Sequence, residues 1–173
     1  DNTVKLWDTN TGKEIKTLTG HTNSVNDVSF SPDGEMIASV SDDSTVKLWN
    51  TSAGNEIKTL TGHTNSVNGV SFSPDGKMVA SANDDKTMKL WDIKTGNEIK
   101  TLTGHTKLVN DVSFSPDGKM IASVSDDSTV RLWRWDFDYL LKEGCNFMRE
   151  YFKTNPPENE SDSDLCPSIT RNP

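Results

Sequence analysis

Four tryptophans, each 42 residues after the one before, impose a fixed period on most of this 173-residue chain. A Gly-His pair and a Ser-Pro-Asp-Gly run return with the same spacing. A fixed period of about 20 to 50 residues is typical of repeat architectures, in which each unit buries its apolar face against its neighbours. The period therefore constrains the fold more than any other feature of the sequence. The four tryptophans are Trp7, Trp49, Trp91 and Trp133.

Within one period, the residues predict β-structure. Short runs rich in β-branched and aromatic residues alternate with turn signals. The Ser-Pro-Asp-Gly run starting at Ser31 is one such signal, because proline presets φ and glycine accepts a positive φ. Gly54 is expected in the left-handed conformation of a later turn. The strands predicted for one unit are 25–30, 36–41, 45–50 and 56–60. Four short strands per unit cannot bury a face alone, so we expect stacked sheets.

Composition excludes several other classes. The mean hydropathy of −0.65 is compatible with disorder, but the strict period indicates a folded array. No apolar run approaches the roughly 18 residues that span a membrane, so no membrane partner is expected. A net charge of −8 argues against a nucleic-acid partner, which needs a basic surface. Two cysteines, Cys145 and Cys166, are too few for a disulfide scaffold, although one bridge stays open as an alternative. We expect a cytoplasmic protein.

The motifs together resemble those of the WD40 β-propeller family. They comprise Gly-His, Ser-Pro-Asp-Gly and a run such as Asp-x-Thr-Val-Lys-Leu-Trp, and they extend over residues 1–134. The resemblance implies four-stranded blades and places the repeats at about 1–19, 20–61, 62–103 and 104–134. Asp1 aligns with Asp43, so the chain opens inside a blade. We therefore expect an all-β, partial propeller of about three to three and a half blades, the C-terminal part of a longer one.

Each unit carries His, Ser, Asp and Trp at fixed offsets, and the first three are the residue types of a hydrolytic triad. The resemblance implies a structural role instead, in which Asp orients His, His reaches Ser, and Ser accepts the indole N–H that a buried Trp must satisfy. Repetition on separate blades also favours structure, because an active site occurs once. Ser41 stays open as an alternative to Ser39. The three sets, which we call tetrads, are His21, Ser39, Asp43 and Trp49; His63, Ser81, Asp85 and Trp91; and His105, Ser123, Asp127 and Trp133.

The resemblance also implies that loops at one end of the blades bind a protein or peptide. The units differ there at Lys86, Lys107 and Leu108, where the other copies have Ser or Asn. A ligand patch at these residues is one hypothesis, and neutral variation of exposed loops is the other. The candidate partner-binding residues are Asn23, Asp42, Asn65, Asp84, Lys86, Lys107, Leu108 and Asp126.

These patterns predict a non-enzymatic interaction scaffold without a cofactor. No metal site is expected, because the three histidines lie on separate blades and cannot converge on one ion. A hydrolase that uses the blade His and Ser is a competing hypothesis. Besides a protein or peptide, the expected partners are the remaining blades of the same ring or a second copy of the chain.

After Trp133 the period stops. Apolar residues from Phe137 to Phe152 recur at spacings of three and four, which predicts an amphipathic helix over 135–155. The helix is expected to pack on the propeller or on a partner. Residues 156–173 are polar and predicted to be disordered. The run starting at Leu140 (Leu-Leu-Lys-Glu-Gly-Cys) resembles the ending of cyanobacterial-type multidomain WD40 proteins. This likeness suggests an alternative function, a sensor module of a larger signalling NTPase of the STAND type.

Overall fold

The computed structural model describes residues 1–135, and Asp1–Trp133 form one compact unit. The described part is built from β-strands without a helix, as the all-β prediction requires. The predicted helix and tail fall on residues 136–173, which lie outside the described residues.

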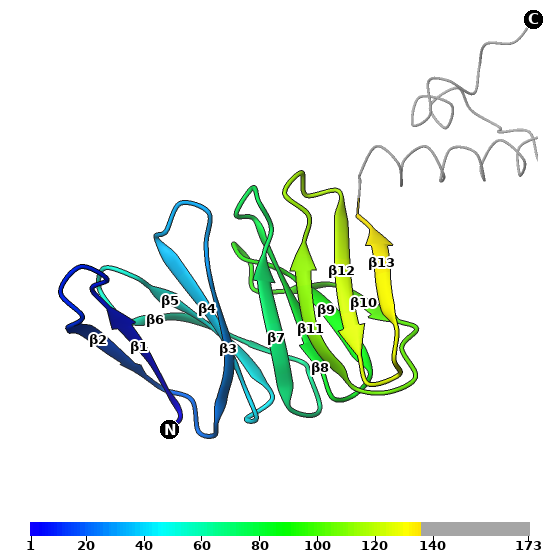
Figure 1. The fold of residues 1–173 in the computed structure, drawn as a ribbon, viewed down its shortest axis with the longest axis horizontal. Helices are drawn as coiled ribbons and strands as arrows, with labels where there is room; N and C mark the ends of the chain where they lie inside the picture. Colours follow the sequence, from blue (N-terminus) through cyan, green and yellow to red (C-terminus); the bar gives the residue numbers. More distant parts are fainter. Residues whose placement is uncertain (136–173) are drawn as a thin grey trace, which may run out of the picture. The chain divides into compact units, whose positions relative to one another are not determined.

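The strands form four antiparallel sheets that follow one another along the chain (Figure 1). The first sheet has two strands, the next two have four each, and the last has three. The strands are β1 (Thr3–Trp7) and β2 (Glu14–Thr19); β3 (Val25–Phe30), β4 (Met36–Ser41), β5 (Thr45–Asn50) and β6 (Glu56–Thr61); β7 (Val67–Phe72), β8 (Met78–Asn83), β9 (Thr87–Asp92) and β10 (Glu98–Thr103); and β11 (Val109–Phe114), β12 (Met120–Ser125) and β13 (Val130–Arg134).

The turn residues act as the sequence predicts. The Ser31 backbone N–H and side chain both bond Met36, and Gly34 adopts a positive φ of 73° that closes the turn between β3 and β4. Gly54 likewise has a φ of 76°. Three of the strands predicted for this unit have the observed bounds, and the fourth extends one residue further, to Thr61. Four-stranded antiparallel sheets are therefore confirmed.

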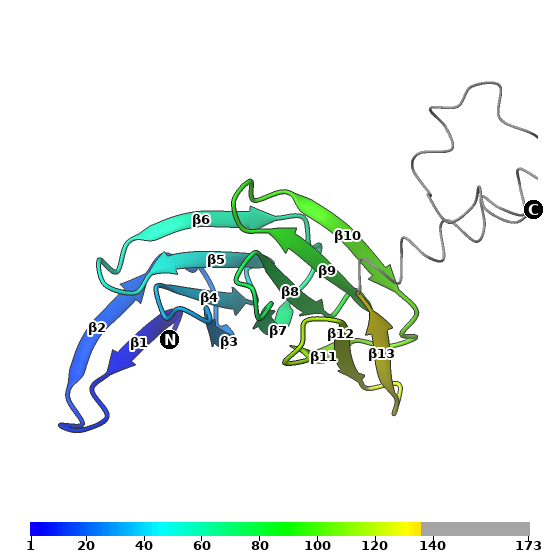
Figure 2. The same cartoon turned by 90° about the horizontal axis from the view of Figure 1, so that it is seen from above.

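The sheets stack through their apolar faces, and the first strand of each sheet lies beside the first strand of the next (Figure 2). β3 contacts β7, and β7 contacts β11. Between the two complete sheets, Val40 and Leu48 of one belong to the same buried cluster as Val70 and Phe72 of the other. The main core of the described chain thus lies between sheets rather than within one.

An asparagine joins each complete sheet to its successor. Asn26 donates Nδ2–H bonds to the Asp42 carboxylate at 2.7 Å and to the Val67 carbonyl of the next sheet at 3.0 Å. Asn68 repeats this with Asp84 at 2.7 Å and Val109 at 3.0 Å. We call this arrangement the inter-sheet Asn bridge. It satisfies a backbone carbonyl at the junction, where an unpaired acceptor would be costly.

A lysine makes a second junction on the outer side of the stack. Lys58 on β6 donates from Nζ to the carbonyl of Lys94 at 2.9 Å, in the turn between β9 and β10. Its stem lies so close to Gly96 that a Cβ at that glycine would meet Lys58 Cδ at 2.5 Å. Lys16 makes the equivalent bond to the carbonyl of Ser52. A side chain at position 96 would displace the Lys58 stem, and the positive φ of 80° also favours glycine in this turn.

Candidate functional site

The first tetrad joins two loops and two strands of one sheet. Trp49 on β5 donates its indole N–H to Ser39 Oγ on β4 at 2.8 Å. Ser39 Oγ lies 2.8 Å from Nε2 of His21, and Nδ1 of that ring lies 2.8 Å from Asp43 Oδ2. A carboxylate only accepts, so Nδ1 carries the proton, and Nε2 of the neutral ring accepts the Ser39 hydroxyl proton. The four side chains form one continuous hydrogen-bond chain. The alternative hydroxyl, that of Ser41, bonds the Asn23 carbonyl instead.

Burial of this tetrad is almost complete. Ser39 is fully buried and Trp49 is 1 % exposed. Removing about 150–250 Å² of indole surface from water contributes about 4–6 kcal/mol before entropy costs. The His21 and Trp49 rings meet edge to face, with centroids 6.1 Å apart. The geometry combines a hydrophobic anchor with a satisfied polar end.

The carboxylate of Asp43 holds the loop before β3 and the turn before β5 together. Burial raises its pKa, but this is outweighed by hydrogen bonds from the Thr45 hydroxyl, the Thr22 backbone N–H and His21, which lower the pKa to about 2. Asp43 is therefore ionised at neutral pH and accepts from both segments at once.

The third tetrad has the same hydrogen bonds as the first, but its tryptophan is less buried. Its distances are 2.8 Å for His105 to Asp127, 2.8 Å for His105 to Ser123 and 2.9 Å for Trp133 to Ser123. The Thr129 hydroxyl, together with His105 and two backbone N–H groups, holds the pKa of Asp127 far below its usual range. Trp133 is only partly buried, unlike its counterparts in the complete sheets, because among residues 1–135 no fourth strand follows β13.

The second tetrad departs from the other two. His63 Nε2 keeps its bond to Ser81 at 2.7 Å, and Trp91 donates to Ser81 at 2.8 Å. Nδ1 of His63, however, lies 3.6 Å from the Asp85 carboxylate and has no hydrogen-bond partner among the described residues. Burial lowers the pKa of His63 to about 4 despite the nearby Asp85. The ring is therefore neutral at pH 7.

The cause lies two residues before Asp85, where Asn83 occupies the position of Ser41 and Ser125. The Ser41 hydroxyl both accepts the Asp43 amide N–H at 3.0 Å and donates to the Asn23 carbonyl at 3.2 Å. Asn83 divides these tasks between its amide oxygen, 2.7 Å from Asp85 N, and its amide nitrogen, 2.7 Å from the Asn65 carbonyl. The longer side chain sets the Asp85 turn further from the histidine.

Two kinds of segment lie together at one end of the sheets. The loops 20–24, 62–66 and 104–108 precede the first strand of a sheet, and the turns 42–44, 84–86 and 126–128 join the second and third strands. Backbone bonds connect them, for example from Asp42 N to Ser24 O at 3.0 Å and from Asp126 N to Leu108 O at 3.2 Å. We call this end the loop face. It carries all of the candidate partner-binding residues.

The aspartates among those candidates are already engaged. Asp42 and Asp84 belong to inter-sheet Asn bridges, and Asp126 accepts from Asn110 at 2.7 Å. These aspartates were predicted on the loop face, but their bridging role was not. The asparagine that recurs at Asn26, Asn68 and Asn110 is the sequence signal that could have indicated it.

The remaining candidates are more accessible. Asn23 and Asn65 are exposed and each accept the next residue's backbone N–H at 2.9 Å. Lys86 and Lys107 are exposed, and Leu108 is partly buried. Lys86 has a φ of 72°, a left-handed conformation that costs a side chain such as lysine about 1–2 kcal/mol. At the two lysines and the leucine, the loop face differs most clearly from the equivalent positions of the other repeats, which have Ser or Asn.

Two further kinds of feature are absent from the part of the chain that the structure describes. Residues 1–135 contain no group of three or more His, Cys, Asp or Glu side chains placed to hold a metal ion. In the same part of the chain, no helix has the length and apolar character needed to cross a membrane.

Comparison with known proteins finds similarity to one family. The family described as WD domain, G-beta repeat matches residues 12–50, 54–92 and 96–134. Among curated proteins, the nuclear distribution protein PAC1 of Arthroderma otae is 52% identical over 44 residues, 25% of this chain and 10% of that protein. Lissencephaly-1 homolog 1 of Paramecium tetraurelia is 54% identical over 43 residues, 25% of this chain and 11% of that protein. Ribosome assembly protein 4 of Saccharomyces cerevisiae is 54% identical over 39 residues, 22% of this chain and 8% of that protein. Each alignment thus spans about one repeat and about a tenth of the relative.

Proposed function

Because the chain belongs to the WD40 repeat family, whose repeats are generally non-enzymatic scaffolds, we propose that it binds a protein or peptide through its loop face and catalyses no reaction. Rigid stacked sheets hold the loops in place, and the residues on the loops give specificity. The roles of the relatives in nuclear distribution and ribosome assembly belong to much longer proteins, so we do not extend them to this chain.

The observation that carries this proposal is the closed environment of each tetrad serine. Ser39, Ser81 and Ser123 are buried, and each is bonded on one side by a histidine and on the other by an indole. A nucleophile must reach its substrate, and a hydroxyl that accepts an indole N–H in the core is not accessible to one. These properties support a structural role for the tetrads.

The loop face offers a different chemistry. Lys86 and Lys107 are exposed cations in a chain of net charge −8, and Leu108 adds an aliphatic side chain next to Lys107 in sequence. Two exposed lysines and a partly buried leucine on the same loop face favour an acidic peptide with one apolar residue. This surface is the part of the proposal that mutation can test directly.

The test is a peptide-display selection against the immobilised full chain, followed by titration of the selected peptides. The triple variant Lys86→Ala, Lys107→Ala, Leu108→Ala should weaken binding at least tenfold. A matched variant at the opposite end, Lys77→Ala with Lys94→Ala, removes two exposed lysines and should leave affinity unchanged. Equal loss of binding in both variants, or in neither, would refute the loop face as the site.

A second candidate function is a sensor module within a longer signalling NTPase of the STAND type. It is favoured by the likeness of the sequence after Trp133 to the endings of such multidomain proteins and by the near identity of the repeats. A Gly-x4-Gly-Lys-Ser/Thr phosphate loop upstream in the same reading frame would support it. A complete reading frame without this motif would exclude it.

A further inference from the structure

Asn68 and Gly69 form the only Asn-Gly pair in the sequence. In the other units the equivalent asparagines, Asn26 and Asn110, are followed by aspartate. An asparagine side chain can be attacked by the backbone nitrogen of the next residue, and glycine has no side chain to hinder that attack. In an unfolded chain, Asn68 is therefore the asparagine most open to spontaneous deamidation.

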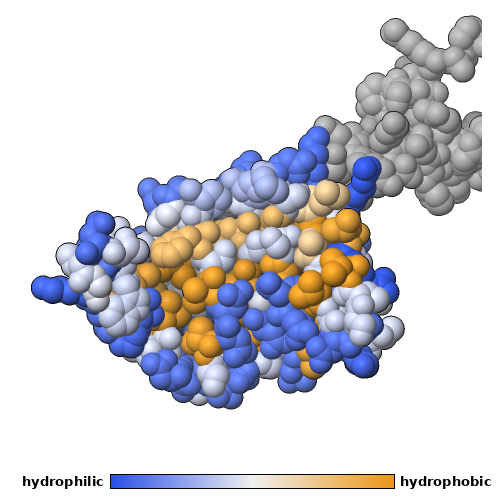
Figure 3. All heavy atoms as spheres, viewed as in Figure 1, coloured by the Kyte–Doolittle hydropathy of each residue, from blue (hydrophilic) through white to orange (hydrophobic). Residues whose placement is uncertain are grey.

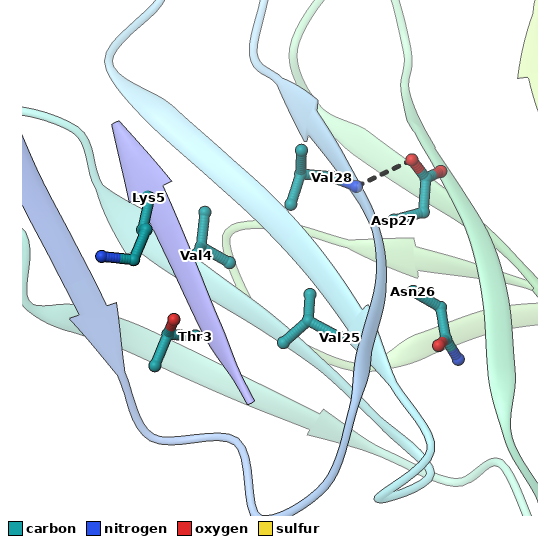
Figure 4. A pocket seen from close by; sticks show the side chains of 7 residues that line it. All are labelled: Thr3, Val4, Lys5, Val25, Asn26, Asp27 and Val28. Atoms are coloured by element: carbon teal, nitrogen blue, oxygen red, sulfur yellow. Dashed lines mark hydrogen bonds between the residues drawn. The ribbon is translucent and has the colours of Figure 1, made fainter. Parts of the chain in front are cut away.

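Packing explains why glycine stands at position 69. β7 contacts β11 of the next sheet, and a Cβ at Gly69 would lie 2.7 Å from Asp111 Cα. A backbone atom cannot move aside as the end of a flexible side chain can, so a larger residue would push the two strands apart. On β3 the equivalent residue is Asp27, whose carboxylate accepts the Val28 N–H at 2.8 Å (Figure 4). The junction that requires glycine thereby creates the reactive pair.

The fold keeps the Asn68 amide from reacting. Its Nδ2 donates to the Asp84 carboxylate at 2.7 Å and to the Val109 carbonyl at 3.0 Å, so two acceptors hold the nitrogen that must leave. Attack also requires the Gly69 nitrogen to eclipse Asn68 Cβ about the Cα–C bond. Both residues belong to β7, and the ψ of about +135° that is usual in antiparallel strands keeps the two atoms well apart. The reaction therefore requires β7 to leave its strand conformation.

We propose that Asn68 is a site of spontaneous deamidation, which stays unreactive while the inter-sheet Asn bridge to Val109 is closed and reacts when this junction opens. The proposal goes beyond ligand binding at the loop face, because it concerns a covalent change of the chain itself and needs no partner protein.

The reaction has two steps and involves no oxidation or reduction. The Gly69 nitrogen attacks Asn68 Cγ, the Cγ–Nδ2 bond breaks, and ammonia leaves with the proton from the Gly69 nitrogen. Water then adds to either carbonyl of the five-membered succinimide and breaks one of its C–N bonds, which gives aspartate or isoaspartate at position 68. Asn68 is the second residue of β7, directly after the loop 62–66, and the surface at this end of the sheets is largely hydrophilic (Figure 3). The water that the second step consumes is therefore at hand.

Either product prevents the junction from closing again. A carboxylate at position 68 has no hydrogen to donate, so it would face the Asp84 carboxylate and the Val109 carbonyl with acceptors only. The two carboxylates would repel each other, and the Val109 carbonyl would lose its partner. Isoaspartate also lengthens the main chain of a strand that is paired with β8. Deamidation thus makes an opening of the junction permanent.

The first experiment incubates the full 173-residue chain in mildly alkaline buffer, with and without a denaturing concentration of guanidinium chloride. Tandem mass spectrometry of proteolytic peptides measures conversion at each asparagine. Asn68 should react at least tenfold faster in the denatured chain than in the folded chain, and at least tenfold faster than Asn26 and Asn110 in the same denatured sample. Equal rates in the folded and denatured chains would overturn protection by the fold. A denatured rate no higher than that of Asn26 would overturn the site.

A pair of variants tests the bridge itself. Asp84→Ala removes one of the two acceptors of Asn68 Nδ2 and should raise the rate at Asn68 in the folded chain at least threefold. Asp126→Ala removes the equivalent acceptor of Asn110 and should leave the rate at Asn68 unchanged. Circular dichroism verifies that both variants are folded. A parental rate in the Asp84→Ala chain, or the same increase in both variants, would refute control by the bridge.

The consequence of the reaction is tested with the product residue in place. Asn68→Asp should lower the urea midpoint of the full chain, because the bridge cannot form. Asn65→Asp makes the same change of charge on the exposed loop, where its side-chain oxygen can still accept the Ser66 N–H, and should leave the midpoint nearly unchanged. Equal midpoints for the two variants would contradict the claim that deamidation keeps the junction open.

Discussion

His63 Nδ1 lies 3.6 Å from the Asp85 carboxylate, whereas the same pair is 2.8 Å apart in the other two tetrads. The other units have serine where Asn83 stands two residues before Asp85. A hydrogen bond of one tetrad is thus lost through a residue outside the tetrad. The effect is local, since Ser81 and Trp91 keep their contacts.

Replacing Asn83 by serine should restore the missing bond. The shorter side chain lets the Asp85 turn approach His63, as in the first and third tetrads, and should stabilise the fold by about 1 kcal/mol. Urea unfolding followed by circular dichroism measures this change. The reverse substitution, Ser41→Asn, should destabilise by a similar amount. An Asn83→Ser chain no more stable than the parent would show that the 3.6 Å separation has another cause.

His63 should make folding stability depend on pH in acid. Its pKa is lowered from 6.5 to about 4 in the folded chain, chiefly by burial. Above pH 6.5 the ring is neutral in both states, so its effect is constant. Between pH 6.5 and 4 the unfolded chain takes up a proton that the folded chain does not, so stability falls as pH falls, by up to about 3 kcal/mol. Below pH 4 the contribution levels off.

Urea midpoints between pH 7 and pH 4 measure this dependence. His63→Gln removes the titrating group and should flatten the curve over that window. Asn83→Ser brings Asp85 closer, should raise the pKa of His63 in the folded chain, and so should reduce the slope. If His63→Gln has the same slope as the parent chain, the histidine is not responsible for it.

Trp91→Ala should strongly destabilise the fold, whereas Trp7→Ala should not. Trp91 is buried, bonded to Ser81 and packed between two sheets, so truncation should cost about 3–5 kcal/mol. Trp7 is exposed and lacks a serine partner in the described chain, so its loss should cost less than about 1 kcal/mol. Thermal unfolding compares them directly. Similar melting temperatures for the two variants would contradict the structural role of the tetrad.

Asn68→Ala should destabilise the chain more than Asn110→Ala. Asn68 bonds both Asp84 and the Val109 carbonyl of the next sheet, so its removal leaves a buried acceptor unpaired. Asn110 bonds Asp126 and reaches no further sheet among the described residues. We expect a difference of about 1–2 kcal/mol in the free energy of unfolding, measured with urea. Equal costs would mean that the inter-sheet Asn bridge adds nothing.

The sequence predicts the strands well because their signals are local and repeated. The Ser-Pro-Asp-Gly turns and the fixed period place β3, β4 and β5 at their observed bounds. The strand predictions depend on residue type and order alone. The contacts within a tetrad, by contrast, are implied by the resemblance of the motifs to WD40 repeats, and the sequence left Ser39 and Ser41 both open as the hydroxyl partner.

Three other features of the structure could not be predicted from the order of residues, because they depend on how side chains and sheets pack in space. The separation of His63 and Asp85 follows from the length of the Asn83 side chain, an effect of less than 1 Å in the position of a turn. The Val67 carbonyl that Asn26 bonds belongs to another sheet, so it becomes visible only once the sheets are stacked. The exposure of Val28 and Trp7 likewise reflects their place in the array, since identical residues elsewhere are buried.

The lysine that contacts the following glycine turn has an evolutionary consequence. Lys58 supplies the donor half of one junction, and the segment containing Gly96 supplies the acceptor half of that junction, one period further along. The segments 1–42, 43–84 and 85–126 each carry both halves. A tandem duplication of whole segments therefore creates a compatible new contact without any compensating mutation, whereas a duplication that is not a whole number of segments would separate donor from acceptor. Growth or shrinkage of such a gene is expected to proceed in whole repeats.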